Sequence, residues 1–479
     1  MQPKKQKLEE KAEFRLRIRN ADQLVIVCSN KEKYKTGKAM DEVEVIEHGT
    51  IIVGNDGKIA AVGPDAKLRE QFNKATFEVD YDATGKSVIP GLVDGHTHPV
   101  WTGDRVNEFK MKLAGATYMD IHKMGGGIGF TVGKTREASE EELLRVCLLL
   151  LLREQLFLDR LKRMGKFGTT LLEAKSGEDH HVTFAQGYGL NLAGELKMLK
   201  VIHMATKQQD VDIVANYCGA HSVPKGMSGC RHLAGSTAAE ARQDIIQNQL
   251  PALIKAKEEG TINPELIDVF CEKNVFEIDD TRQIITAGQK AGLLINIHGD
   301  ELSPIKAAEL ASEVGTCWYQ TWSAGALAVS HLEEVSDEGI KAMAAASPQP
   351  VIATLLPTTA YVLRIKPPPC RKLITDVGVP VALGSDFNPN AHCLSMPHVM
   401  NLACVLMRMT CNEALVAATI NAAASLNRSA THAGSLEVGK WGDCVVLKTS
   451  PWEHVIYEIG DPPIECVFKK GQALFSSTD

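Results

Sequence analysis

The chain has 479 residues, of which 44% are hydrophobic and 23% are charged, and its formal net charge is −7. This length suits one large α/β barrel with a small companion domain, or two or three ordinary domains, and the acidic balance gives no sign of a surface that binds nucleic acid. The 12 cysteines are scattered without a CxxC pair, which is typical of reduced thiols in a cytosolic, cytoplasmic protein.

The first 22 residues mix basic and acidic side chains and contain no apolar stretch. We therefore expect residues 1–22 to form an N-terminal extension and not a secretion signal. The most apolar run, residues 146–152, is too short to cross a bilayer, because a spanning helix needs about 20 residues. This run predicts the buried face of a long helix, with Ser139 and Glu142 as a capping box at its start. No membrane segment is expected.

The two ends of the chain share a sequence pattern that predicts short strands joined by turns. Residues 50–63, TIIVGNDGKIAAVG, place an Asn-Asp-Gly turn between two apolar runs. Residues 432–479 repeat this pattern. We expect residues 23–87 and 432–479 to form one composite β-sandwich domain beside a catalytic domain at residues 88–431.

Short apolar runs alternate with helix-like segments between residues 88 and 431. The runs are rich in Val, Ile and Leu without polar alternation, as in parallel strands that are buried on both faces. Eight such units predict a (β/α)8 barrel of the α/β class. The runs are residues 91–96, 169–174, 211–217, 266–270, 293–298, 326–330, 351–356 and 381–386.

Polar side chains that suit metal chemistry follow many of these runs. A barrel gathers the carboxyl ends of its strands at one mouth, where active sites of this fold lie. We therefore expect these side chains to meet there. They are His96, His98, Lys175, His221, His298, His331 and Asp386.

The pair His96 and His98 is the strongest single signal, because alternate side chains at a strand end share a face. Together with His298 and Asp386 they predict a site for one divalent metal ion, Zn²⁺ or iron (Fe²⁺/Fe³⁺), with room for a water molecule. A bound ion makes hydroxide available near neutral pH. Asp386 can accept the proton of the water, and His331 and Glu301 are further candidates for acid or base. The reaction class is hydrolysis of a C–N bond in an amide, cyclic amide or amidine.

Several motifs in register resemble the imidazolonepropionase family of the amidohydrolase superfamily. They are PGLVDGHTHPVW, EAKSG, YGL, GAHSVP, HGDE, SHLEEVS, LLPTTAY and LGSDFNPNAHC. The resemblance covers nearly all of residues 20–479. It implies hydrolysis of the 4-imidazolone-5-propanoate ring to N-formimidoyl-glutamate in histidine degradation, and a homodimer.

The resemblance also implies roles for individual residues. The metal ligands are His96, His98, His298 and Asp386, and His331 is the acid or base beside them. Arg105 matches an arginine that holds the substrate, and a guanidinium is the natural bidentate partner of a propionate carboxylate. The other implied substrate contacts are Tyr118, Tyr188, His221, Glu301, Asn388 and the main chain around Asn390 and Ala391. At position 390 the family more often has glycine.

The chain departs from the family pattern at three places, where residues 146–158, 178–187 and 316–325 look inserted. Two other functions stay open. A deaminase of an aromatic ring such as guanine or cytosine would share the metal site without needing Arg105. A catalytically impaired isoform would bind metal without turnover, and a non-catalytic scaffold would share only the fold. Lys175 is a charge-balancing residue or, alternatively, a carboxylated lysine that bridges two metals.

Overall fold

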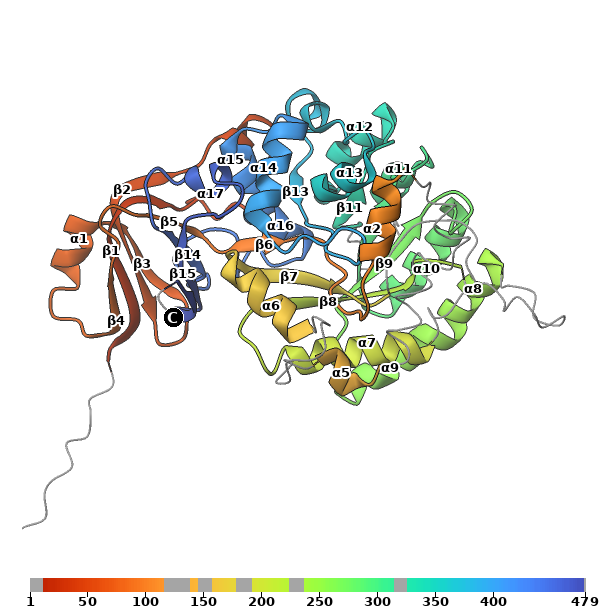
Figure 1. The fold of residues 1–479 in the computed structure, drawn as a ribbon, viewed down its shortest axis with the longest axis horizontal. Coiled ribbons are helices and arrows are strands. Elements are labelled where there is room, and N and C mark those ends of the chain that lie inside the picture. Colours follow the sequence, from red (N-terminus) through yellow and green to blue (C-terminus); the bar gives the residue numbers. More distant parts are fainter. Residues whose placement is uncertain are drawn as a thin grey trace, which may run out of the picture.

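The computed structural model describes residues 12–115, 138–144, 157–177, 192–223, 237–313 and 325–477. Two units lie side by side, a large barrel and a smaller sheet unit that contains both ends of the described chain (Figure 1). The position of the functional residues depends on the barrel.

The barrel contains eight parallel strands, as the sequence predicts. Each strand pairs with the next one along the chain. Beyond the strand ends the first and last members meet, because the amide of His98 donates to the carbonyl of Phe387 at 2.9 Å. The strands are β6 (Leu92–Asp94), β7 (Thr169–Lys175), β8 (Asp212–Ala220), β9 (Leu266–Cys271), β10 (Leu294–Gly299), β11 (Ala328–His331), β12 (Ile352–Leu355) and β13 (Val381–Leu383).

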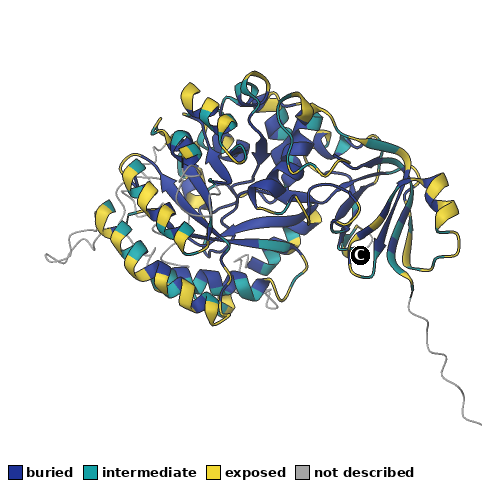
Figure 2. Ribbon diagram, turned by 180° about the vertical axis from the view of Figure 1, so that it is seen from behind, coloured by how far each residue is buried: buried dark blue, intermediate teal, exposed yellow. Residues whose placement is uncertain are grey.

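Helices surround this barrel with their apolar sides inward, so that exposed residues lie on their outer sides (Figure 2). The predicted capping box is confirmed, because the amide of Glu142 donates to Ser139 Oγ at 3.1 Å and the amide of Ser139 donates to the Glu142 carboxylate at 2.7 Å. The helices are α2 (Val106–Leu113), α5 (Glu140–Leu144), α6 (Phe157–Lys166), α7 (Leu192–Ala205), α8 (Ala238–Asp244), η2 (Ile245–Gln249), α9 (Leu250–Glu258), α10 (Ile278–Lys290), α11 (Ala307–Glu313), α12 (Asp337–Ala345), α13 (Pro357–Leu363), η4 (Lys372–Val377), α14 (Met396–Met407), α15 (Cys411–Ala417) and α16 (Ile420–Ser425).

The smaller unit is one sheet drawn from both ends of the chain. Its order is β16-β15-β14-β5-β1-β2-β3, with β4 beside β1. The sheet folds over itself, because Tyr81 on β4 packs against Phe468 on β15 with ring centroids 5.9 Å apart. The elements are β1 (Phe14–Val25), η1 (Gly37–Asp41), β2 (Val45–Gly54), β3 (Ile59–Pro64), α1 (Asp65–Gln71), β4 (Phe77–Asp82), β5 (Ser87–Pro90), β14 (Cys444–Leu447), α17 (His454–Tyr457), β15 (Ile464–Lys469) and β16 (Gln472–Ser476).

The expected N-terminal extension is too long, because β1 already begins at Phe14. Leu16 and Ile18 are fully buried in the core of the small unit. The arginines that alternate with them conceal this pattern in the sequence, and two of these pair with acidic residues of the neighbouring β4: Arg17 with Asp80 and Arg19 with Asp82. Residues 14–22 therefore belong to the sheet.

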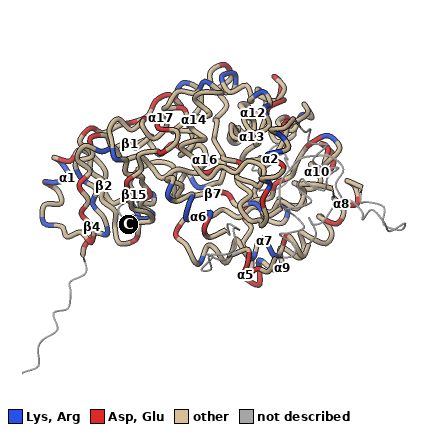
Figure 3. Tube along the Cα trace, viewed as in Figure 1, with Lys and Arg blue, Asp and Glu red and all other residues tan. Residues whose placement is uncertain are grey.

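Basic and acidic residues are interspersed along the described chain (Figure 3). Within the described ranges, no helix is both long and apolar enough to cross a membrane. Most of the three apparent insertions lies outside the described residues. The parts outside are residues 146–156, 178–187 and 316–324.

Candidate metal centre and substrate site

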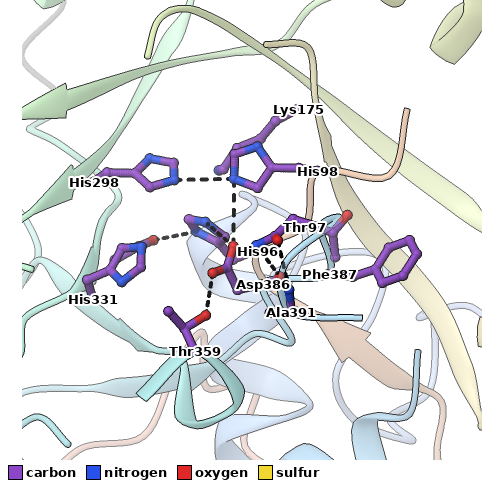
Figure 4. A network of polar contacts seen from close by, with 12 residues as sticks. His96, Thr97, His98, Lys175, His298, His331, Thr359, Asp386, Phe387 and Ala391 are labelled. Atoms are coloured by element: carbon purple, nitrogen blue, oxygen red, sulfur yellow. Dashed lines mark hydrogen bonds and ion pairs between the residues drawn. The ribbon is translucent and has the colours of Figure 1, made fainter. Parts of the chain in front are cut away.

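The carboxyl ends of β6, β10 and β13 bring the four predicted metal ligands together (Figure 4). His98 Nε2 lies 3.4 Å from His298 Nε2 and 3.7 Å from Asp386 Oδ1. His96 Nε2 lies 3.5 Å from the same Asp386 oxygen. All four side chains are at most 1% exposed. Residues almost 300 positions apart in the sequence therefore direct their ligand atoms to one point.

This arrangement fits one metal ion. Ligand atoms at about 2.0–2.2 Å from a shared ion lie roughly 3.4 Å apart when the geometry is tetrahedral. Two of the atoms, His96 Nε2 and Asp386 Oδ1, are buried without a hydrogen-bond partner among the described residues. Burying such groups without a partner is unfavourable, and a cation accounts for both of them.

Neighbouring groups orient the three imidazoles through their other nitrogen. His298 Nδ1 lies 2.7 Å from Asp268 Oδ1, and His96 Nδ1 lies 2.8 Å from Ser330 Oγ. The Nδ1 of His98 lies 3.4 Å from the carbonyl oxygen of Gly177. These contacts leave each Nε2 facing the centre, which is how metal-binding histidines are usually held.

The surroundings of the three histidines favour the neutral ring, which is the form that binds metals. Burial lowers the pKa of His96, His98 and His298 well below the ordinary value, because the charged ring would lose its hydration. The cationic Lys175 lowers these pKa values further.

Lys175 is the centre of a fully buried ion-pair network beneath the ligands. Its Nζ lies 2.8 Å from Asp268 Oδ2 and also contacts Glu173. Burial alone would lower the pKa of Lys175, but Asp268 and Glu173 hold it above the ordinary value. Asn216 and Asn296 donate to the Glu173 carboxylate at 2.7 and 3.2 Å. A lysine held as a cation in this way favours the charge-balancing role over the carboxylated one.

His331 lies on the other side of the ligands, between two carboxylates. Its Nδ1 is 3.5 Å from Glu301 Oε1 and 3.6 Å from Glu333 Oε2. Burial opposes the charge on the ring, but Glu301 and Glu333 raise the pKa of His331 to about 10. The ring centroid of His331 lies 5.5 Å from that of His298. A charged imidazole therefore stands beside the candidate metal ligands.

His221 completes the cluster of imidazoles. Its ring centroid lies 4.8 Å from that of His298 and 5.2 Å from that of His98. Burial lowers the pKa of His221 to about 3, so this ring is neutral. Distances alone also allow the groups His98–His221–His298 and His96–His298–His331 to hold an ion. The unpartnered atoms of His96 and Asp386 favour the predicted set.

Arg105 stands at the start of α2, and only 6% of it is exposed. Its Nε donates to Glu108 Oε2 at 2.7 Å. Its Nη2 is buried and has no hydrogen-bond partner among the described residues. This side chain therefore offers a buried donor to an anion.

The loop after β13 uses its asparagines internally. Asn388 Oδ1 accepts hydrogen bonds from the amides of Asn390 and Ala391 at 2.6 and 2.9 Å, and Asn388 Nδ2 donates to the carbonyl of Asp386 at 2.9 Å. Asn390 Oδ1 accepts from Lys112 Nζ. Asn388 thus shapes the loop that carries Asp386, and contacts of either side chain with a substrate stay predictions.

Tyr118 and Tyr188, two of the predicted substrate contacts, lie outside the described residues. The backbone is strained at two predicted residues, because His331 has a φ of 80° and Asp386 a φ of 48°. Sequence reasoning missed several supporting side chains. The signal for two of them was a carboxylate inside an otherwise apolar strand. The missed residues are Glu173, Asp268, Ser330, Glu333 and Thr359, whose hydroxyl donates to Asp386.

Comparison with solved structures agrees with this architecture. A triazine hydrolase variant has a TM-score of 0.63 at 17% identity, over 97% of this chain and 95% of that one. The guanine deaminase of C. acetobutylicum has a TM-score of 0.60 at 17% identity, over 96% and 99%. These likenesses show the fold. Residues 190–474 match the Amidohydrolase family. Fold and site together define a metal-dependent hydrolase of the amidohydrolase class.

Curated relatives narrow this class. The probable imidazolonepropionase of Mus musculus is 54% identical over 463 residues, which is 96% of this chain and 98% of that protein. The human and Dictyostelium discoideum proteins of the same name are 52% and 53% identical, over 96% and 98% of this chain and 99% of each relative. The chain belongs to the imidazolonepropionase family.

Proposed function

We propose that this chain hydrolyses 4-imidazolone-5-propanoate to N-formimidoyl-L-glutamate. The observation that carries the proposal is Arg105, because its buried Nη2, which has no hydrogen-bond partner among the described residues, offers a carboxylate a binding partner near the candidate metal ligands of the barrel mouth. A guanidinium binds a carboxylate with directional, charge-assisted hydrogen bonds. The propionate tail of this substrate supplies such a carboxylate.

We infer that His96, His98, His298 and Asp386 hold one divalent ion, Zn²⁺ or iron. When bound, such an ion lowers the pKa of a water molecule toward neutrality and so makes hydroxide available. The neutral state of the three imidazoles supports this role, since a protonated ring cannot be a ligand.

The side chains of this site handle the protons. The oxygen of water bonds to the ring carbonyl carbon, and the bond from this carbon to the ring nitrogen breaks. Asp386 accepts the proton that the water loses, and His331, charged between Glu301 and Glu333, donates a proton to the departing nitrogen. Glu301 faces the ring as a hydrogen-bond acceptor.

Substrate binding uses groups on several strand ends. Arg105 binds the carboxylate, and the neutral His221 offers a hydrogen bond to the ring. Tyr118, Tyr188, Asn388 and the main chain around Asn390 are further proposed contacts. The resemblance to the family also leads us to propose a cytosolic homodimer, which sedimentation of the purified chain tests.

The experiment is turnover of freshly prepared 4-imidazolone-5-propanoate by the purified, metal-analysed chain, followed by loss of the ring absorbance. We expect activity with about one metal ion per chain, and a loss of roughly 100-fold or more in kcat/KM for Arg105→Ala, because a buried charged contact is removed. Full activity of Arg105→Ala on this substrate would show that Arg105 does not bind its carboxylate, and a wild type that binds metal but fails to turn it over would favour a ring deaminase. A chain that binds no metal would refute the site.

A further inference from the structure

A second cation lies near Arg105 on the same helix. Arg105, Glu108 and Lys112 follow one another at spacings of three and four residues, which places them on one face of α2. Lys112 is partly buried, whereas Lys110 on the same helix is exposed. The face of α2 that carries Arg105 therefore presents two basic groups and one acidic group.

The charges on this face do not balance among the described residues. The Nε of Arg105 donates to the Glu108 carboxylate. The Nη2 of Arg105 is buried and has no hydrogen-bond partner among the described residues. Lys112 Nζ contacts the neutral Asn390 Oδ1 and forms no ion pair with any of the described residues. Burial and the nearby Arg105 lower the pKa of Lys112, so the two cations share one environment. A partly buried net positive charge of this kind is stabilised by an anion.

The contact with Asn390 fixes where Lys112 points. Asn390 lies in the loop after β13, four residues beyond Asp386, and the amide of Asn390 is held by Asn388 Oδ1 at 2.6 Å. The lysine amine is thereby tied to the loop that carries a candidate metal ligand. α2 itself follows the strand that leads to His96 and His98.

We propose that Lys112 is a second binding residue for the substrate carboxylate, on the same face of α2 as Arg105, and that Asn390 positions its amine. This inference rests on the proposed function. Lys112 then discriminates in favour of imidazolone rings with an anionic tail. Because the tail does not react, its contact is equally strong in the ground state and the transition state, and loss of the contact raises KM without lowering kcat.

The kinetic test compares Lys112→Gln with Lys112→Arg and with the matched control Lys110→Gln on the exposed face of α2. We expect Lys112→Gln to raise KM for 4-imidazolone-5-propanoate about tenfold at nearly unchanged kcat. Lys112→Arg restores most of the affinity because it restores the charge, and Lys110→Gln behaves like the wild type. Unchanged KM in Lys112→Gln, or an equal loss in Lys110→Gln, would overturn the inference.

A binding test separates this inference from the proposed reaction. The probes are 3-(imidazol-4-yl)propanoate and its neutral amide, measured by calorimetry on the metal-loaded chain. We expect Lys112→Gln to weaken the acid about tenfold and to leave the amide unchanged. If the wild type fails to turn over the imidazolone but shows this pattern, the reaction is wrong and the carboxylate site stands. If it turns over the substrate while Lys112→Gln binds acid and amide like the wild type, only the inference fails.

The role of Asn390 has its own readout. If Asn390 acts only through Lys112, Asn390→Ala raises KM in the wild-type background and has no further effect in Lys112→Gln. Additive effects of the two substitutions would show that Asn390 does not position Lys112.

Discussion

Asp268 decides which nitrogen of His298 faces the metal centre. It accepts the Nδ1 proton of His298 at 2.7 Å with one oxygen, and its other oxygen lies 2.8 Å from Lys175 Nζ. A carboxylate in this position fixes the imidazole tautomer and increases the basicity of Nε2. Lys175 balances the charge, so that a full carboxylate is tolerated at 0% exposure.

We predict that Asp268→Asn lowers metal affinity by about 10- to 100-fold, because an amide is a weaker acceptor for the Nδ1 proton. Competition with a chelator and analysis of bound metal measure this effect without relying on activity. Ser330→Ala is the matched control, since Ser330 supports His96 as a neutral partner, and its loss should be smaller. Wild-type metal affinity in Asp268→Asn would contradict the prediction.

The sequence singles out the candidate ligands more readily than the residues that support them. His96, His98, His298 and Asp386 stand out because imidazoles and carboxylates at strand ends are rarely needed for packing. The role of Asp268 depends on where its side chain meets His298 across neighbouring strands, and this pairing of β9 with β10 is a property of the folded sheet. The role proposed for Lys112 is equally hidden in the sequence, because its hydrogen-bond partner Asn390 lies 278 residues away.

At the scale of elements, the end of β13 comes unusually close to His96. A Cβ built on Gly384 would lie 2.7 Å from His96 Cβ and 3.0 Å from a Leu356 methyl carbon. Such distances require glycine. The close approach allows the amide of Asp386 to donate to the carbonyl of His96 at 3.0 Å, so the two ligand-bearing segments are joined directly.

Gly384→Ala should therefore separate these segments. Overpacking of this kind typically costs about 1–3 kcal/mol of stability, and we expect a fall in bound metal because His96 and Asp386 move apart. Thermal unfolding and metal analysis measure the two effects. Gly460→Ala is the control, since nothing lies within 4 Å of a Cβ at that exposed position. Normal metal content and stability in Gly384→Ala would contradict the close-contact argument.

Strands were easier to predict than other elements for a physical reason. The barrel strands are buried on both faces, so they are rich in Val, Ile and Leu, and their positions agree with the predicted runs to within a few residues. β1 was missed at its start because Arg15, Arg17 and Arg19 stand on its more accessible face and pair with distant partners. Local composition does not reveal such pairs.

At the scale of the whole molecule, a buried charge cluster joins the barrel to the small sheet. Lys469 on β15 is 2% exposed, and its Nζ lies 2.5 Å from Asp443 Oδ2 and 2.8 Å from Asp212 Oδ2. Asp212 begins barrel strand β8. Lys470 also reaches Asp212, at 2.9 Å, but 35% of its side chain is exposed. Both lysines thus link the small sheet to the barrel, and Lys469 does so from a buried position.

Lys469→Met should lower the free energy of unfolding by roughly 3–5 kcal/mol, because it removes the cation and leaves carboxylates at the interface without their main partner. Lys470→Met, the control at the more accessible lysine, should cost at most about 1 kcal/mol. Urea titrations of the wild type and both variants measure these differences. Equal losses in the two variants would show that burial of the Lys469 ion pairs is not what matters.

The Lys469→Met deficit should also depend on pH. Burial raises the pKa of Asp443 above its ordinary value of 3.8 even with Lys469 present, and Lys469 opposes this rise. Without the lysine the pKa rises further, so the folded variant binds a proton that the unfolded chain has already lost. The stability deficit is therefore largest near pH 7.5, where folding of the variant requires a charged, buried Asp443 carboxylate. The deficit shrinks as the pH falls toward the ordinary pKa of Asp443, because the folded and the unfolded variant then both bind the proton. Urea titrations at pH 7.5 and at pH 5 check the sign, and a deficit that grows on acidification would contradict this account of the joint between the two units.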